Sequence, residues 1–210
     1  MGIVYKAEDI RLKRFVALKF LPDDLTRDAQ AVERFKQEAQ KASAMDHQNI
    51  CTIYEFSETD DGHMFMAMAY YDGETLRQKI QTYQFDVDEM TAVVKQLSHG
   101  LSQAHKKNIV HRDVKPANII FASDGILKIL DFGLAKLSGQ DRLTKQISTL
   151  GTIAYMAPEQ LSGKFIDHRV DVWSVGVIMY EMLTGFRPFR GEIEQAVIYS
   201  ILNEEPDPIS

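Results

Sequence analysis

The sequence has almost no cysteine: Cys51 is the only one among 210 residues. A single thiol cannot form an internal disulfide, and the residues beside Cys51 show none of the spacings typical of zinc sites. We therefore interpret Cys51 as a core residue in a protein of a reducing compartment. A hydrophobic core has to hold the fold together, and 210 residues are enough to bury one.

An excess of basic residues is also lacking, because 24 Lys and Arg stand against 30 Asp and Glu, for a net charge of −6. The cations are scattered along the chain, whereas proteins that bind a phosphate backbone gather them. This pattern argues against a nucleic-acid partner.

Long hydrophobic runs are absent as well. The longest, residues 172–180, lies between Asp171 and Glu181 and is well short of the ~20 residues that a membrane span needs. Lys6 and Glu8 interrupt any signal-peptide pattern at the amino terminus. We expect no membrane segment in this chain and a cytoplasmic location for it, although a full-length protein could carry an anchor elsewhere.

The first third of the chain has the pattern of a small sheet with one helix. Residues 3–8 and 14–21 are rich in β-branched and aromatic side chains, and 52–56 and 64–70 flank a turn signal, so four strands are predicted. Between them, residues 29–44 carry apolar side chains at helical spacing.

The remainder is predicted to be mainly helical, which makes the fold class α+β. A long helix starts near Asp86, whose side chain can cap it, and further helices are predicted over 168–183 and 192–202. A hairpin over 119–130 turns at Asp124-Gly125. Residues 134–157 lack sustained periodicity and are predicted to form a long functional loop.

Chemistry-bearing residues bracket this hairpin. Before it stands His111-Arg112-Asp113-Val114-Lys115-Pro116-Ala117-Asn118, which combines a base, a cation and an amide. After it comes Asp131-Phe132-Gly133, so that one hard oxygen ligand from each side could hold magnesium. Alone, either motif could be a polar loop; together they indicate a phosphoryl-transfer centre.

These motifs, with Ala157-Pro158-Glu159 and Val16-Ala17-Leu18-Lys19, resemble the catalytic domain of eukaryotic-like serine/threonine protein kinases, most closely those of bacteria. The resemblance implies a two-lobed fold with a small antiparallel-sheet N-lobe containing one long helix and a larger, mainly helical C-lobe. It places the N-lobe at 1–70, the hinge at 71–73 and the C-lobe at 74–210.

The resemblance also implies the catalytic roles. Asp113 would be the base that accepts the proton of the substrate hydroxyl, and Lys115 would neutralise the transferred phosphate. Asn118 and Asp131 would hold Mg²⁺, with Mn²⁺ as an alternative ion. The expected acceptors are serine and threonine hydroxyls of protein substrates.

ATP binding is implied for a further set of residues. Lys19 lies in an apolar strand and needs an anionic partner, for which Glu38 is the candidate. The resemblance assigns the pocket itself, from roof to purine edge, to Gly2, Val4, Ala17, Met68, Ala69 and Tyr71. Plain core packing remains an alternative interpretation for the methionine and aromatic residues among them.

Regulation would act through the long loop. Arg112 would pair with a phosphate on it, for which Thr144 and Thr149 are candidate acceptors beside Ser148. Thr152 would contact Asp113 and Lys115. His111 and Phe132 would pack together, and Asp171 would anchor the catalytic-loop backbone with Trp173 beside it.

The chain departs from the family pattern at both ends. Only Gly2 remains of the glycines that cover the phosphates, and the last family helices are missing, so an incomplete domain is expected. This leaves an alternative function, a catalytically impaired kinase-like module or pseudokinase that binds partner proteins. Self-association is expected through autophosphorylation or through the exposed faces.

Overall fold

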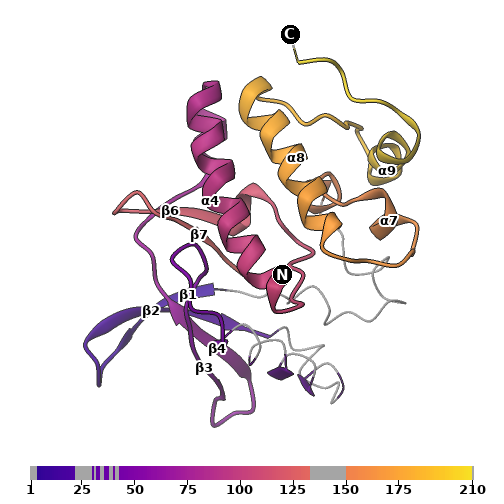
Figure 1. The fold of residues 1–210 in the computed structure, drawn as a ribbon. Helices are drawn as coiled ribbons and strands as arrows, with labels where there is room; N and C mark the ends of the chain where they lie inside the picture. Colours follow the sequence, from indigo (N-terminus) through magenta and orange to yellow (C-terminus); the bar gives the residue numbers. More distant parts are fainter. Residues whose placement is uncertain are drawn as a thin grey trace.

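The computed structural model describes residues 4–21, 30, 32–33, 36–37, 40, 43–132 and 150–209. Strands dominate the first third of the chain and helices the rest, with the second, smaller sheet lying between the two parts (Figure 1). The α+β class predicted from the sequence is confirmed.

The first sheet is antiparallel and consists of β1 (Val4–Asp9), β2 (Arg14–Phe20), β3 (Ile53–Glu58) and β4 (Met64–Ala69) in the order β1-β2-β4-β3. Each strand begins within a residue of its predicted range. Because β2 is an inner strand, its Lys19 stands between Val4 on β1 and Met66 on β4.

The second sheet has three strands, β5 (Gly73–Thr75), β6 (Ile119–Ala122) and β7 (Leu127–Ile129). The predicted hairpin between β6 and β7 is confirmed. Gly125 takes a φ of 79° in the turn, a conformation that glycine adopts without steric cost. The hairpin brings the ends of the two motifs together, since Leu130 donates its N–H to the carbonyl of Asn118 at 2.8 Å.

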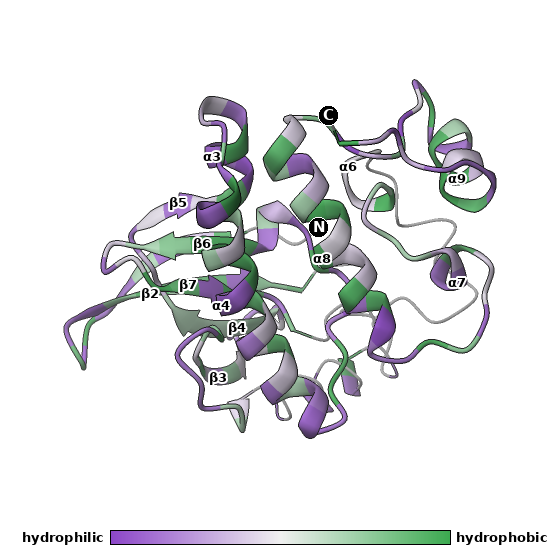
Figure 2. Cartoon of the chain, turned by 45° about the horizontal axis from the view of Figure 1, so that its top comes forward, coloured by the Kyte–Doolittle hydropathy of each residue, from purple (hydrophilic) through white to green (hydrophobic). Residues whose placement is uncertain are grey.

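Helices α4 (Val87–Lys106) and α8 (Arg169–Thr184) form the centre of the helical part, followed by α9 (Glu194–Asn203). Asp86 caps α4 in a reciprocal capping box with Glu89, as the sequence predicted. The two long helices lie side by side, and α8 is predominantly hydrophobic (Figure 2). Leu97, Ile129 and Ile178 are fully buried in the core between them and the second sheet.

Short elements were not predicted. The η1 turn (Pro116–Asn118) ends the motif that begins at His111, and α3 (Leu76–Thr82) follows β5. Helices α6 (Leu150–Ile153) and α7 (Pro158–Leu161) interrupt the stretch that the sequence assigned to a loop or left unassigned. The prediction of a loop up to residue 157 is therefore wrong at its end, where Ile153 and Ala154 are buried in the core. The predicted helix over 29–44 lies mostly outside the described residues.

A short segment before β3 joins the first sheet to the second. Ile129 donates its N–H to the carbonyl of Asn49 and accepts from the N–H of Cys51, both at 2.9 Å. Gly100 of α4 faces this junction, where an added Cβ would come 2.8 Å from Ile129 and 3.3 Å from Asn49. The junction fixes how the strand carrying Lys19 approaches the second sheet. Among the described helices, none is long and apolar enough to span a membrane.

Candidate active site

Asp113 lies in the loop of residues 111–115, called the catalytic loop. Asp171 of α8, whose side chain is fully buried, holds this loop by hydrogen bonds. One carboxylate oxygen accepts the N–H of His111 at 2.9 Å, and the other accepts the N–H of Arg112 at 2.8 Å. Arg112 has a φ of 69°, in the left-handed region that residues with side chains seldom adopt. Such a conformation costs about 1–3 kcal/mol, so the surrounding bonds must hold it.

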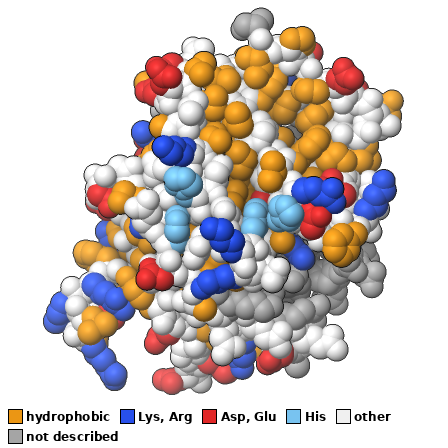
Figure 3. All heavy atoms as spheres, viewed as in Figure 1, with side chains coloured by type: hydrophobic (Ala, Val, Ile, Leu, Met, Phe, Trp, Pro, Cys, Tyr) orange, Lys and Arg blue, Asp and Glu red, His pale blue; other side chains and the backbone are white. Residues whose placement is uncertain are grey.

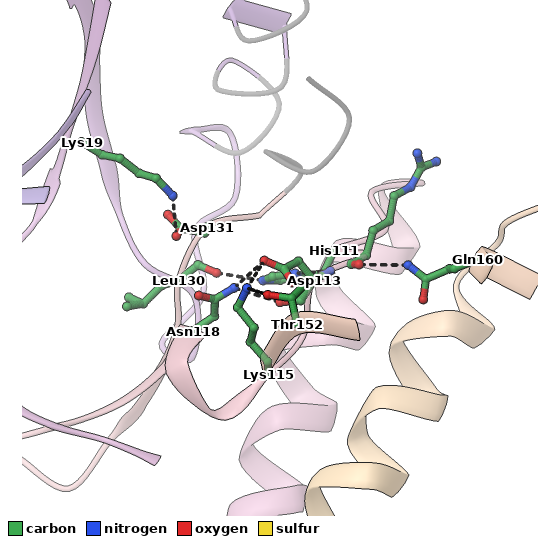
Figure 4. Close-up of polar contacts among 10 residues, drawn as sticks. Lys19, His111, Asp113, Lys115, Asn118, Leu130, Asp131, Thr152 and Gln160 are labelled. Carbon is green, nitrogen blue, oxygen red and sulfur yellow. Dashed lines mark hydrogen bonds and ion pairs between the residues drawn. The ribbon is translucent and has the colours of Figure 1, made fainter. Parts of the chain in front are cut away.

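Asp113 lies in a cluster with a cation, an amide and a hydroxyl. Lys115 Nζ contacts Asp113 Oδ2 at 2.8 Å and Thr152 Oγ1 at 3.0 Å. Asn118 donates from Nδ2 to the carbonyl of Asp113 at 2.9 Å and to its Oδ2 at 3.1 Å. Thr152 was predicted to contact both Asp113 and Lys115; the contact with Lys115 is confirmed, and among the described residues no hydrogen bond between Thr152 and Asp113 is found. Figure 4 shows this cluster, to which η1, α6 and the catalytic loop contribute.

The burial of these groups suits proton transfer and charge neutralisation. The Lys115 side chain is 6% exposed, whereas that of Asp113 is 27% exposed. Asp113 can therefore reach a molecule in solvent while a largely desolvated ammonium stands beside it. Both of its donors meet Oδ2, and among the described residues no hydrogen bond to Oδ1 is found. A hydroxyl group can approach the carboxylate at that second oxygen.

Lys19 and Asp131 form an ion pair across the junction of the two sheets. Lys19 Nζ lies 2.5 Å from Asp131 Oδ2, and the side chains are 13% and 17% exposed. Asp131 therefore supplies an anionic partner for Lys19. Glu38, the partner predicted from the sequence, lies outside the described residues, so its contact with Lys19 stays a prediction. Asp131 has a φ of 61°, a second strained position in the site.

His111 and Phe132 pack against one another with ring centroids 4.7 Å apart, and both side chains are buried. The His111 ring also contacts the carbonyl of Leu130 through Nε2 at 2.8 Å. This contact ties the catalytic loop to the residue before Asp131. The geometry agrees with the packing role predicted for both rings.

Asn118 and Asp131 can each offer an oxygen to a metal ion. Both described hydrogen bonds of the Asn118 side chain use Nδ2, which leaves its carbonyl oxygen available. Across the described ranges there is no group of three or more His, Cys, Asp or Glu side chains that could hold a metal by itself. Two protein oxygens fit Mg²⁺ shared with nucleotide phosphates, because Mg²⁺ is usually bound by one or two side chains plus substrate oxygens.

The predicted adenine-binding residues lie on facing strands and on the segment after them. Ala17 pairs with Met68 in the sheet, and Ala69 pairs with Val16. Met68 is buried and lines a void of about 10 Å³ shared with Cys51, Phe132 and Asp131. Tyr71 accepts the N–H of Thr52 on its hydroxyl at 3.3 Å. Val4 is 53% exposed.

Several predicted site residues cannot be placed, because Gly2, Thr144 and Thr149 lie outside the described residues. Arg112 is among the described residues, and its carbonyl oxygen accepts a hydrogen bond from Gln160 Nε2 at 3.0 Å. Its buried Nε has no hydrogen-bond partner among the described residues.

Two contributors were missed in the sequence. Gln160 on α7 contacts the catalytic loop, and His105 on α4 contacts Asp171 Oδ2 at 2.7 Å. Neither belongs to one of the kinase motifs in the sequence, and each is linked to the loop through tertiary structure. A polar side chain just after Ala157-Pro158-Glu159 gave no signal of its own.

The sequence matches the protein kinase domain family over residues 1–208. It is 39% identical over 215 residues to serine/threonine-protein kinase PknB of Mycobacterium leprae, covering 100% of this chain and 35% of that protein. Identity to PrkC of Bacillus subtilis is 37% over 206 residues, covering 98% of the chain and 32% of that kinase. Identity to pkn3 of Myxococcus xanthus is 36% over 217 residues, covering 99% of this chain and 40% of that kinase.

The chain thus spans about a third of the length of these curated relatives, between 32% and 40%. Together with the arrangement of the motifs described above, these matches show that the chain belongs to the protein kinase family and is homologous to bacterial serine/threonine protein kinases.

Proposed function

We propose that this chain transfers the terminal phosphoryl group of ATP to serine or threonine hydroxyls of protein substrates. The observation that carries the proposal is the cluster around Asp113, in which a partly exposed carboxylate stands beside a buried ammonium and an amide. This arrangement provides a proton acceptor and a positive charge at one point, as phosphoryl transfer to a hydroxyl requires.

In this proposal the substrate hydroxyl binds at Asp113 Oδ1, the oxygen that accepts no hydrogen bond from the described residues, and gives its proton to the carboxylate. The Lys115 ammonium lies next to the same carboxylate and offsets the negative charge of the moving phosphoryl group. Thr152 contacts Lys115 and thereby joins the segment after the long loop to the reacting centre. Transition-state charge stabilisation of this kind is often worth 10²- to 10³-fold in rate.

ATP would bind between the first sheet and the catalytic loop, with Lys19 on its phosphates. Asn118 and Asp131 would hold the Mg²⁺ ion, which supplies neutralisation of the phosphate charge. Lys19 forms an ion pair with Asp131 in this structure. When ATP and Mg²⁺ bind, Lys19 would contact the phosphates and Asp131 would contact the metal ion. The backbone groups of residues Ala69 to Tyr71 would contact the purine, and the Met68 side chain would lie beside it.

The test is transfer of labelled phosphate from Mg²⁺–ATP to a generic basic protein, followed by identification of the phosphorylated amino acid. We expect phosphoserine and phosphothreonine from the wild type, and a loss of about 10²- to 10⁴-fold in the Asp113→Asn variant.

Asp124→Asn is the matched control, because Asp124 is an exposed carboxylate in the β6–β7 turn and, among the described residues, accepts a hydrogen bond from the Ile126 N–H alone. Its rate should equal that of the wild type. Equal labelling by the wild type and Asp113→Asn would contradict the proposal.

A second candidate, a kinase-like module that binds partner proteins without transferring phosphate, is favoured by one observation. The Lys19–Asp131 ion pair joins the two side chains that ATP and metal would need. This reading predicts that Mg²⁺–ATP does not raise the unfolding temperature. A rise that disappears in Lys19→Met would instead support the kinase.

A further inference from the structure

The Tyr71 side chain joins the segment that follows β4 to the residue that precedes β3. Its hydroxyl accepts the N–H of Thr52 at 3.3 Å, and the carbonyl of Thr52 accepts the N–H of Ala69 at 2.9 Å. Both backbone groups of Thr52 are therefore used by the segment of residues 69–71. The two contacts hold this segment at its first and last residues and so restrict its backbone from both ends.

A lysine of the second sheet lies over the ring of the same tyrosine. Lys128 of β7 places its Nζ 5.2 Å from the centroid of the Tyr71 ring. A cation and an aromatic face attract one another within roughly 6 Å. The neighbours of Thr52 and Lys128 are joined as well, because Cys51 donates its N–H to the carbonyl of Ile129 at 2.9 Å. The Tyr71 side chain is therefore held from the sides of both sheets.

We propose that the side chains of Tyr71 and Lys128 form a clamp that holds the backbone of residues 69–71 in the conformation that binds the purine. This inference rests on the proposed kinase function, in which that backbone contacts the purine of ATP. Both side chains are positioning groups and act on none of the reacting atoms. A segment that is already fixed in its binding conformation loses less entropy when the ligand binds. The clamp therefore raises the affinity for ATP and leaves the chemical step at Asp113 unchanged.

A second pair of a lysine and an aromatic ring provides a matched control. Lys79 of α3 lies 4.5 Å from the centroid of the Phe121 ring on β6, and neither residue belongs to the segment 69–71. The residues of the clamp and of the control lie outside α4 and α8, over which hydrophobic side chains gather on the face shown in Figure 3. Self-association through that surface would therefore affect the clamp variants and the control alike.

The test measures the Kd for Mg²⁺–ATP by calorimetry, together with the KM for ATP and the kcat of phosphoryl transfer. Tyr71→Phe keeps the ring and removes the hydroxyl, so its Kd and KM should rise by about 2- to 10-fold. Lys128→Met removes the cation, and the same constants should rise by about 2- to 5-fold. Lys128→Arg, which keeps a cation, and the control Lys79→Met should stay close to the wild type. The kcat should be unchanged in all four variants.

A double-mutant cycle sharpens the test. Tyr71→Val removes the ring, so the ammonium of Lys128 no longer has an aromatic face to contact. Lys128→Met should therefore raise the Kd in the wild-type background and leave it unchanged in the Tyr71→Val background. Equal effects of Lys128→Met in the two backgrounds would overturn the proposal. So would a wild-type Kd in both Tyr71→Phe and Lys128→Met, or an equal rise in Lys79→Met.

Amide hydrogen exchange separates the clamp from the kinase function itself. The N–H of Thr52, which the Tyr71 hydroxyl accepts, should exchange faster in Tyr71→Phe than in the wild type with no nucleotide present. Lys79→Met should leave this exchange unchanged. A wild type that binds no Mg²⁺–ATP would refute the proposed function, whereas unchanged exchange at Thr52 in Tyr71→Phe would refute the clamp.

Discussion

The two sides of the proposed reaction centre are held in different ways. On the acceptor side, Asp171 and Gln160 bond the catalytic loop, and Thr152 bonds Lys115 within it. On the nucleotide side, Lys19 meets this loop region, as far as the structure describes it, through a single ion pair with Asp131. The acceptor side is therefore organised before any substrate binds, whereas one described ion pair links the Lys19 side chain to it.

The cores beneath the two sides differ as well. Leu97 and Ile178 belong to the large buried cluster that packs the helices against the second sheet. Behind the first sheet, the described buried cluster consists of Leu21, Met64 and Met66. More apolar surface is removed from water under the catalytic loop, and this surface is the main source of its stability.

Among changes to the link between the two sides, the largest effect is expected from breaking the Lys19–Asp131 ion pair. Lys19→Met removes the ammonium, leaves Asp131 without its partner and should lower the transfer rate by at least about 100-fold. Lys6→Met is the matched control on the same sheet, because Lys6 lies over the rings of Phe15 and Tyr70 and forms no described ion pair with Asp131. Initial rates at saturating ATP measure the effect. A wild-type rate in Lys19→Met would show that the ion pair has no part in catalysis.

A pair of core truncations sharpens the comparison of the two cores. Leu97→Ala should lower the free energy of unfolding by about 2–5 kcal/mol, because the fully buried site cannot collapse around the cavity. Met66→Ala, in the smaller cluster, should cost less and should act mainly by raising the KM for ATP. Urea unfolding and initial-rate kinetics on both variants decide this. A larger loss of stability in Met66→Ala would reverse the ranking of the cores.

The α+β class and the long elements could be predicted from the sequence because their signals are local. Asp86 and Glu89 form a capping box, and Asp124-Gly125 is a hairpin turn. Helix α3 was missed although Thr75 and Gln78 show the same capping pattern. Helix α6, within the end of the predicted loop, was missed because the helix is short and its apolar residues show no helical periodicity of their own. Ile153 is buried against other elements of the core.

The site could be predicted as a set of residue types, but not as a set of contacts. Asp113, Asn118 and Asp131 were found because they stand in recognisable motifs. The ion pair of Lys19 with Asp131 joins residues that the two sheets bring together, and the contact of His105 with Asp171 joins two helices. Tertiary packing creates these partnerships, so no local pattern in the sequence reports them.

The smallest effect concerns Cys51, at the junction between the two sides. Burial, followed by the charge of Asp131, raises the pKa of its thiol from 9.0 to about 12. The unfolded thiol ionises first, so the stability contributed by the neutral buried thiol is complete below pH 9 and is lost as the pH rises from 9 to 12. Cys51→Ala should remove this part of the alkaline destabilisation.

Iodoacetamide offers a second readout of the same thiol. The folded protein should react slowly at pH 8, because little thiolate is present and the side chain is 5% exposed. Protein unfolded in urea should react rapidly under the same conditions. Fast reaction of the folded protein would mean that the junction opens readily and that the two sides are less firmly joined than the structure indicates.

In the proposed mechanism Asp113 accepts the proton while Lys19 and Asp131 hold the nucleotide. One paired measurement on Asp113→Asn tests this division of roles most directly: the Kd for Mg²⁺–ATP by calorimetry and the single-turnover rate of phosphoryl transfer. We predict a Kd close to that of the wild type and a transfer rate lower by at least about 100-fold. An unchanged transfer rate, or a loss of ATP binding that accounts for the whole decrease, would contradict it.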